Sequence, residues 1–298
     1  MERNIRLVIA YEGTEYHGWQ TQGGLRTIQG LLEQGARRVL RHQVYVVGSG
    51  RTDAGVHAAG QVAHVRTTSG IPPWNMLRAI GSRIPKDISL IDVSEVSRAY
   101  HARRSATSKL YRYRMHAAPG RPVMRAAQRY VYHYWSPLDL DRMREGARYF
   151  VGEMDFSAMA AKGCERETMV RTVLRCDVHR RLDEIRVDVE GKGFLYNQVR
   201  NMVGTLIEVG RGRWEPDHIQ TILKSRDRGQ AGPTAPARGL CLQWVRYPAE
   251  LLDPNYIPGD WQPVEAEAEA AEANAQAAEG AEQETAEREL PSGDAGTP

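Results

Sequence analysis

The sequence predicts an α+β protein made of two units of similar design, followed by a polar tail. Short runs rich in β-branched residues alternate along residues 4–248 with stretches in which apolar residues recur at helical spacing. The chain has 298 residues, which is enough for two domains, or for one large one, with a sizeable core. The order of the elements then indicates how each unit is built.

The first unit opens with an apolar strand close to the start of the chain. Its first helix is indicated by Ile28, Leu31, Leu32 and Val39, which fall on one side of a helix. A second helix starts near Pro73, because proline is favoured in a first turn. In order, we expect a strand at 5–11, a helix at 27–40, strands at 43–47 and 60–66, the second helix, and a strand at 88–93. The order β-α-β-β-α-β is the ferredoxin-like arrangement.

The second unit again mixes strands and helices. In order, we expect strands at 109–116 and 129–135, a helix at 138–151, a hairpin at 170–189, helices at 196–209 and 216–223, and a strand at 240–247. We therefore divide the chain into an N-terminal α+β unit at 1–106, a C-terminal α+β unit at 107–248 and a tail at 249–298.

The tail is acidic and rich in Ala and Glu. It has nothing to bury, which predicts a segment that is disordered or fleetingly helical. Residues 262–298 carry a net charge of −9, whereas residues 1–261 carry +12 within the overall +3. We interpret the tail as a solvated appendage; the competing hypothesis is that it imitates polyphosphate and screens a basic cleft.

Arginine supplies 35 of the 40 basic residues. Because a guanidinium binds phosphate bidentately and stacks on bases, nucleic acid is the favoured partner of this surface. A genomic bias toward arginine would explain part of the preference over lysine, but not the net excess of charge. The expected phosphate contacts, each of which fits solvated surface equally well, are Arg37, Arg38, Arg41, Arg78, Arg83, Arg103 and Arg104.

Two further features indicate a cytoplasmic protein with no membrane partner. The sequence has no apolar run near 18 residues and no signal-like start. Cys164, Cys176 and Cys241 are odd in number and widely separated, which favours reduced, structural thiols over a disulfide framework or a zinc ribbon.

Residues 48–58, Gly-Ser-Gly-Arg-Thr-Asp-Ala-Gly-Val-His-Ala, are the most informative stretch. They join two expected strands, and such loops are where rigid scaffolds place chemistry. The glycines permit positive φ and the close approach of a bulky partner. Arg51 could hold the carboxylate of Asp53 ionised, and an ionised carboxylate can act as a nucleophile. Asp53 is therefore the candidate catalytic residue.

Other interpretations of this loop remain. An Asp flanked by Gly and Thr also fits an ordinary turn. A phosphate cradle is disfavoured because no Lys-Ser or Lys-Thr follows the glycines, whose spacing is not that of a dinucleotide site. A metal site at Asp53, His57 and His64 is disfavoured because these residues mix loop and strand and lack a Cys-x-x-Cys partner.

The eleven-residue string as a whole resembles the signature of the tRNA pseudouridine synthase A (TruA) family. Three further motifs match that family in order along roughly residues 4–248. They are Tyr-Glu-Gly-Thr-x-Tyr-x-Gly-Trp-Gln-x-Gln at 11–22, Lys-Leu-Tyr-Arg-Tyr at 109–113 and Gly-Phe-Leu-Tyr-Asn-Gln-Val-Arg-Asn-Met-Val-Gly at 193–204. Four ordered motifs make a chance match improbable.

The resemblance implies two pseudo-symmetric, ferredoxin-like or RRM-like domains with joined antiparallel, mixed sheets and a central basic cleft. Asp53 would be the catalytic carboxylate, and Arg200 would pair with it and keep it charged. Tyr111 would lie against the target base, and Arg51 would contact the backbone of the flipped nucleotide or help open the stack. From the residues alone, Tyr111 reads as a core aromatic and Arg200 as an arginine that reaches solvent beside a buried helical stripe.

The motif at 11–22 is less decisive. Trp19, with Gln20 and Gln22, could bind RNA by stacking and hydrogen bonding. We favour a structural role, in which Gly13 and Gly18 shape a tight turn and Trp19 plugs it.

The activity that the resemblance implies is isomerisation of uridine to pseudouridine in tRNA, on the anticodon arm at about positions 38–40. The family also implies a homodimer, and the reaction needs no cofactor and no metal. Whether Asp53 adds to the sugar C1′, adds to the base C6 or removes a proton from C2′ stays open. A binding module without catalysis would show an aromatic-rich, glycine-punctuated strand, and a metal-dependent nuclease would show clustered carboxylates; the sequence has neither.

Overall fold

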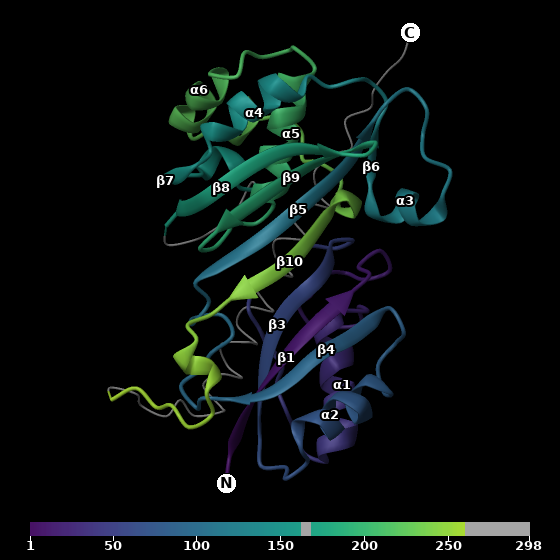
Figure 1. Cartoon of the computed structure of the whole chain (residues 1–298), viewed down its shortest axis with the longest axis vertical. Coiled ribbons are helices and arrows are strands. Elements are labelled where there is room, and N and C mark those ends of the chain that lie inside the picture. The colour runs from purple at the N-terminus through teal and green to yellow at the C-terminus, as the bar shows by residue number, and fades with distance from the viewer. Residues whose placement is uncertain (162–167, 260–298) are drawn as a thin grey trace.

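A computed structural model describes residues 1–161 and 168–259. These residues form a 10-stranded sheet with helices packed on it, and two halves follow one another along the long axis of the molecule (Figure 1). Residues 249–259 of the expected tail return to the N-terminal half, where the Ser97 amide donates to the Leu251 carbonyl at 3.2 Å. The rest of that tail, and Cys164, lie outside the described residues.

The N-terminal half has the predicted β-α-β-β-α-β order. Its elements are β1 (Arg3–Tyr11), α1 (Ile28–Leu40), the short β2 (Val47–Gly48), β3 (His57–Thr67), α2 (Pro73–Gly81) and β4 (Ile88–Val96). Strand β1 lies between β3 and β4 and is antiparallel to both. Its alternate residues Ile5, Leu7 and Ile9 are buried in the main core, which also takes the apolar faces of α1 and α2.

The C-terminal half is built on a second group of strands. Its elements are β5 (Ser108–Ala117), α3 (Arg125–Tyr130), β6 (Tyr132–Tyr134), α4 (Leu140–Arg148), β7 (Gly152–Asp155), β8 (Val170–Arg181), β9 (Glu184–Gly191), α5 (Gln198–Gly210), α6 (His218–Ser225) and β10 (Leu240–Arg246), with short 3-10 turns at Ser157–Met159, Arg228–Gln230, Ala237–Gly239 and Glu250–Leu252. Helix α5 is buried along almost its whole length, which makes it the central helix of this half.

Strand β10 joins the two halves. The strand order is β4-β1-β3-β10-β5-β9-β8-β7, so the last strand of the chain lies between β3 of the first half and β5 of the second. It pairs in parallel with β3 through Cys241 and Leu242, and antiparallel with β5 along its length. The predicted α+β fold with a joined, mixed sheet is therefore confirmed.

The strand expected at 43–47 is wrong for all but its last residue. The Val46 amide donates to Glu33 Oε1 at 3.1 Å, and the Val46 carbonyl accepts from Gln29 Nε2 at 3.0 Å. Hydrogen bonds to side chains of α1 thus take the place of the strand-to-strand hydrogen bonds that the β-branched composition suggested. Val44 and Val46 are buried because they pack in the core, and not because they lie in a sheet.

The strand expected at 129–135 is also mostly wrong, because it begins within α3 and only Tyr132–Tyr134 forms a strand, paired with the end of β5. Contacts with the other half hold the preceding residues. Arg129 pairs with Glu12 at 2.9 Å, and the Tyr130 ring meets the edge of His57 with centroids 5.1 Å apart. These tertiary contacts outweigh the local preference of the aromatic residues for a strand.

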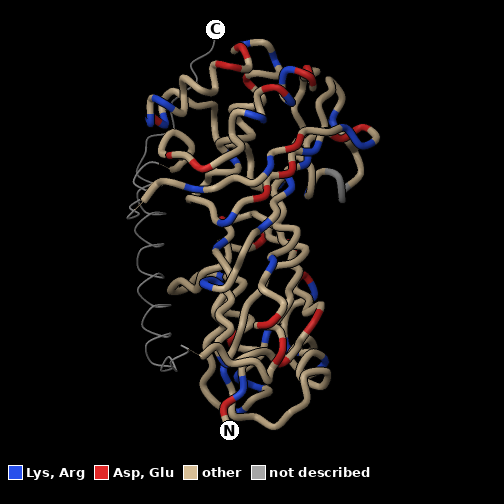
Figure 2. The backbone as a smooth tube through the Cα atoms, turned by 60° about the vertical axis from the view of Figure 1, so that its left-hand side comes forward, with Lys and Arg blue, Asp and Glu red and all other residues tan. Residues whose placement is uncertain are grey.

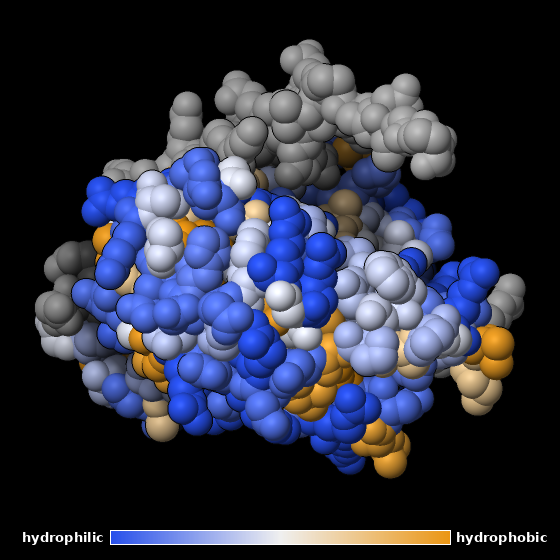
Figure 3. All heavy atoms as spheres, turned by 90° about the horizontal axis from the view of Figure 1, so that it is seen from above, coloured by the Kyte–Doolittle hydropathy of each residue, from blue (hydrophilic) through white to orange (hydrophobic). Residues whose placement is uncertain are grey.

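Basic and acidic residues are spread over both halves (Figure 2). The end of the molecule formed by the C-terminal half is largely hydrophilic, with separate apolar patches (Figure 3). Within residues 1–161 and 168–259, every helix is too short or too polar to cross a membrane.

Candidate active site

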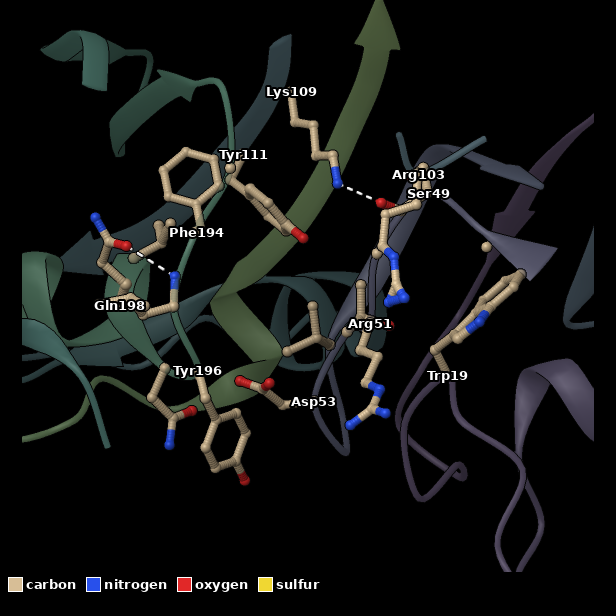
Figure 4. Close-up of a pocket in the computed structure, with 18 of the residues that line it drawn as sticks. Trp19, Ser49, Arg51, Asp53, Arg103, Lys109, Tyr111, Phe194, Tyr196 and Gln198 are labelled. Carbon is tan, nitrogen blue, oxygen red and sulfur yellow. Dashed lines mark hydrogen bonds between the residues drawn. The ribbon is translucent and has the colours of Figure 1, made fainter. Parts of the chain in front are cut away.

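A cavity of about 570 Å³ lies where the two halves meet. Pockets that enclose small ligands usually measure roughly 300–1,000 Å³, so this one can accept a single nucleoside. Its walls come from the 47–53 loop, from β5 and from residues 192–200, which lead into α5 (Figure 4). The structure brings together all four predicted site residues, since Arg51, Asp53, Tyr111 and Arg200 line this cavity.

The backbone of the Asp53 loop is fixed on both sides of the carboxylate. The Thr52 hydroxyl bonds to the Tyr11 hydroxyl at 2.8 Å, and the Val56 amide donates to the Asp53 carbonyl at 3.1 Å. Gly55 has a φ of +76°, a conformation that favours glycine. The turn therefore fixes the backbone position from which the Asp53 side chain projects.

The motif at 11–22 packs beneath this loop. A Cβ at Gly13 or Gly18 would come within 2.6 Å of a backbone oxygen of the loop, so both positions need glycine. Trp19 is only 2% exposed and packs against Gly48, where a Cβ would lie 2.6 Å from the indole ring. This burial supports the structural role favoured for Trp19, whose side chain also lines the cavity.

Asp53 and Arg200 form an ion pair across the cavity. Arg200 Nη1 lies 3.1 Å from Asp53 Oδ2, and each side chain is 17% exposed. The same Nη1 donates to Asn197 Oδ1 at 2.7 Å, and Nε donates to the Ala235 carbonyl at 2.8 Å. The guanidinium is thus held by three acceptors, and its charge favours the ionised form of the carboxylate against the effect of burial. The predicted contact between the two side chains is confirmed.

Tyr111 presents a buried phenol to the cavity. It is 8% exposed and meets Phe194 edge to face, with centroids 5.4 Å apart. Burial raises the pKa of Tyr111, and the nearby Tyr11 and Asp53 act in the same direction, so the phenol is neutral at physiological pH. Phe194 belongs to the 193–204 motif, but the sequence did not reveal that it supports Tyr111.

The described residues that line the cavity include one carboxylate, that of Asp53, and six basic side chains. The basic ones are Arg51, Arg103, Lys109, Arg171, Lys192 and Arg200. Of the seven arginines expected to contact phosphate, Arg103 lines the cavity, whereas Arg37 pairs with Glu33 on α1 at 3.4 Å. Arg171 and Lys192 were not predicted as site residues, because nothing in the local sequence marks a residue at a strand end as lying opposite a distant loop.

The two histidines of the metal hypothesis bind backbone amides. His57 Nδ1 accepts from the Gly13 amide at 3.0 Å, and His64 Nδ1 accepts from the Ala102 amide at 3.2 Å. Burial lowers the pKa of His57, which favours this neutral, accepting form. Across the described part of the chain, no three His, Cys, Asp or Glu side chains gather as a metal site would require.

Comparison with known proteins shows the family that the chain matches. A family model described as tRNA pseudouridine synthase matches residues 7–103 and 147–248. The tRNA pseudouridine synthase A 2 of Clostridium perfringens is 42% identical over 245 residues, which cover 82% of this chain and 100% of that protein. The tRNA pseudouridine synthase A of Coxiella burnetii is 40% identical over 261 residues, which cover 85% and 99%.

One solved structure, a Cbf5–Nop10–Gar1 complex, matches with a TM-score of 0.33 and 12% identity, over 80% of this chain and 57% of that one. A TM-score this low supports no conclusion about this chain. The fold, the basic cavity and the family match define a pseudouridine synthase, an isomerase that acts on RNA. More specifically, the chain belongs to the tRNA pseudouridine synthase A family.

Proposed function

We propose that this tRNA pseudouridine synthase acts on the anticodon arm, at about positions 38–40, with Asp53 as its catalytic carboxylate. The observation that carries the proposal is the Asp53 side chain in a basic cavity, 3.1 Å from the guanidinium of Arg200. The excess of positive charge suits a substrate whose target nucleoside is flanked by phosphates.

The reaction breaks the bond between C1′ of the ribose and N1 of uracil. The freed uracil turns while it is still held, a bond forms between C1′ and C5, and the proton on C5 leaves as N1 gains one. Substrate and product are isomers, so no electrons are exchanged. One ionised carboxylate serves each of three routes: addition to C1′, addition to C6, or removal of a proton from C2′.

The neighbours of Asp53 fit supporting roles. Arg200 keeps the carboxylate charged and oriented in a cavity that partly shields it from water. Tyr111 stacks on the extruded uracil, and its neutral phenol can donate or accept a hydrogen bond there. Arg51, on the same loop as Asp53, contacts the backbone of the flipped nucleotide.

Resemblance to the family supports a proposal about the assembly around this site. We propose a cytoplasmic homodimer in which each chain has a catalytic N-terminal unit at 1–106, a C-terminal unit at 107–248 that supplies Tyr111 and Arg200, and an acidic tail. The +12 charge of residues 1–261 supports RNA as the partner.

Mapping the modified nucleotides tests the substrate assignment. Unmodified tRNA transcripts with uridine at positions 38, 39 or 40 are incubated with the protein, and pseudouridine is located by carbodiimide labelling and primer extension. We expect modification at these positions, and none in a transcript with cytidine at all three. Pseudouridine confined to another arm of the tRNA would refute the assignment.

A further inference from the structure

Lys109 is a half-buried amine at the boundary between the two halves, and the proposed reaction gives it no role. It lies on β5 two residues before Tyr111, so the two side chains project from the same face of the strand. Both line the cavity, and in Figure 4 the Lys109 ammonium points at the Asp53 loop.

The Lys109 ammonium donates a hydrogen bond to the Ser49 carbonyl. Ser49 is fully buried, its amide donates to the Val62 carbonyl at 2.7 Å, and its hydroxyl donates to Gln61 Oε1 at 2.7 Å. Gln61 Nε2 also donates to the Gly50 carbonyl at 3.0 Å. Val62 and Gln61 belong to β3, in the same half as the loop, whereas Lys109 reaches it from the other half.

Glycine at position 50 leaves room for this contact. A Cβ on Gly50 would lie 2.9 Å from Lys109 Nζ. The peptide that follows the Ser49 carbonyl leads to Arg51 and Asp53 within four residues. A shift of the carbonyl would therefore move the catalytic loop relative to β5.

The surroundings of Lys109 disfavour its charge. Burial lowers the pKa of Lys109 from 10.5 to about 8, and the charge of Arg103 acts in the same direction. The other charged groups of the cavity are Arg51 and Asp53 from the loop, Arg171 from β8, Lys192 after β9 and Arg200 from α5. Its other titratable groups are His101, Tyr111 and Tyr196.

We propose that Lys109 is a positioning residue for the isomerisation: its ammonium holds the Ser49 carbonyl and so keeps Asp53 at a fixed distance from Tyr111. The inference rests on the proposed catalytic role of Asp53. A charged donor binds a carbonyl more strongly than a neutral amine does, so the loop is held best while Lys109 is protonated. Displacement of a catalytic group by about 1 Å can cost roughly 100-fold in rate.

The proposal predicts an alkaline limb in the rate of the chemical step. The protonated fraction of Lys109 falls as the pH rises through about 8, so kcat is highest below that pH and falls above it. Tyr111 does not produce this limb, because its pKa is raised by burial.

The test compares Lys109→Met and Lys109→Arg with the wild-type protein, using single-turnover tritium release from about pH 6.5 to about pH 9.5. We expect Lys109→Met to lower kcat by roughly 10- to 100-fold and to abolish the alkaline limb. Lys109→Arg keeps a charge at every pH, so we expect a partial rate without the limb. Circular dichroism and thermal unfolding check that each variant folds.

Lys192→Met is the matched control, because it removes the same charge from the same cavity at an exposed position. We expect it to raise KM for tRNA and to keep the alkaline limb. The proposal is overturned if Lys109→Met has a kcat within about twofold of the wild type, or retains the limb. If that variant does not fold, an unchanged limb in Lys109→Arg overturns it.

The Asp53→Asn variant distinguishes failure of the positioning role of Lys109 from failure of the proposed catalytic role of Asp53. Activity in Asp53→Asn would refute the catalytic role of the carboxylate, whatever Lys109 does. An inactive Asp53→Asn, together with a Lys109→Met variant of normal rate and pH profile, would refute only the positioning role.

Discussion

The proposed catalytic role of Asp53 requires a carboxylate that is both ionised and partly shielded from water. Those conditions oppose each other, because burial disfavours charge. Arg200 reconciles them, and it is itself held by Asn197 and by the Ala235 carbonyl, so it cannot follow the carboxylate into solvent without losing two further hydrogen bonds. We therefore propose that the ion pair serves to orient and charge Asp53 more than to stabilise the fold.

Arg200→Met should lower the rate of the chemical step by roughly 100-fold or more. The reason is that Asp53 loses the guanidinium that orients its carboxylate and compensates its charge. Single-turnover rates measure this effect.

The control for this variant is Arg186→Met on β9. Arg186 pairs with Glu184 at 3.1 Å with both side chains 15% exposed, which matches the Arg200 pair in distance and closely in burial. We expect Arg186→Met to leave this rate unchanged. An equal loss of rate in the two variants would mean that Arg200 acts through stability alone.

Two substitutions of Tyr111 distinguish a stacking role of its ring from a proton-transfer role of its hydroxyl. Tyr111→Phe keeps the ring against Phe194, whereas Tyr111→Ala removes it. Since stacking on a base is worth about 1–3 kcal/mol, we expect the Ala variant to weaken tRNA binding by roughly 5- to 150-fold and the Phe variant to leave it nearly unchanged. Equilibrium binding of an anticodon-arm RNA measures this, and equal weakening in both variants would contradict the stacking role.

At the scale of elements, helix α5 and the loop that crosses it place the arginine. A Cβ on Gly204 would lie 1.7 Å from the Pro233 carbonyl oxygen, so the loop passes the helix at backbone contact. One turn earlier, the Ala235 amide donates to the Arg200 carbonyl at 3.2 Å, while the Ala235 carbonyl accepts from Arg200 Nε. The close approach of the loop at Gly204 thus positions the Ala235 carbonyl, and this carbonyl orients the Arg200 side chain.

Gly204→Ala should lower the free energy of unfolding by roughly 1–3 kcal/mol and lower kcat as well. Alanine favours a helix by up to about 1 kcal/mol relative to glycine, so a loss of stability would show that the crossing loop decides the outcome. Urea unfolding measures the first effect and tritium release the second.

Gly81→Ala, at the end of α2, serves as the comparison. A Cβ there meets nothing within 4 Å, so we expect unchanged or slightly greater stability and normal activity. Greater stability and full activity in Gly204→Ala would contradict this account of the crossing.

Sequence patterns predicted those elements whose own side chains decide their structure. Apolar periodicity predicted α1 and β1, and helix α4 begins later than expected because Asp139 caps it by accepting from the Asp141 and Arg142 amides. The segment at 43–47 could not be predicted in this way, since its hydrogen-bond partners are on α1. Likewise, no periodic pattern signals the contact between Asp53 and Arg200, which are 147 positions apart, and that prediction came from family resemblance alone.

At the scale of the whole molecule, the active site exists only when the two halves are joined. Strand β10 pairs with β3 and β5 together, and the cavity lies at that junction. Asp53 comes from one half and Arg200, Tyr111 and Lys109 from the other. The net positive charge of residues 1–261 suits the approach of RNA to this junction.

Deleting residues 262–298 should leave the salt dependence of tRNA binding unchanged, because a solvated tail makes no contact with the cleft. Affinities from about 50 mM to 200 mM salt measure this. Arg103→Met is the reference, since losing one phosphate contact lowers the slope by about one. A change of slope on deletion would favour the hypothesis that the tail screens the cleft.

The most direct test of the catalytic role is tritium release from tRNA labelled at uridine C5, with Asp53→Asn compared to the wild type. Asparagine keeps the shape of the side chain but cannot ionise, so we predict that release falls by at least about 1,000-fold while tRNA still binds. Release at the wild-type rate from Asp53→Asn would contradict the account.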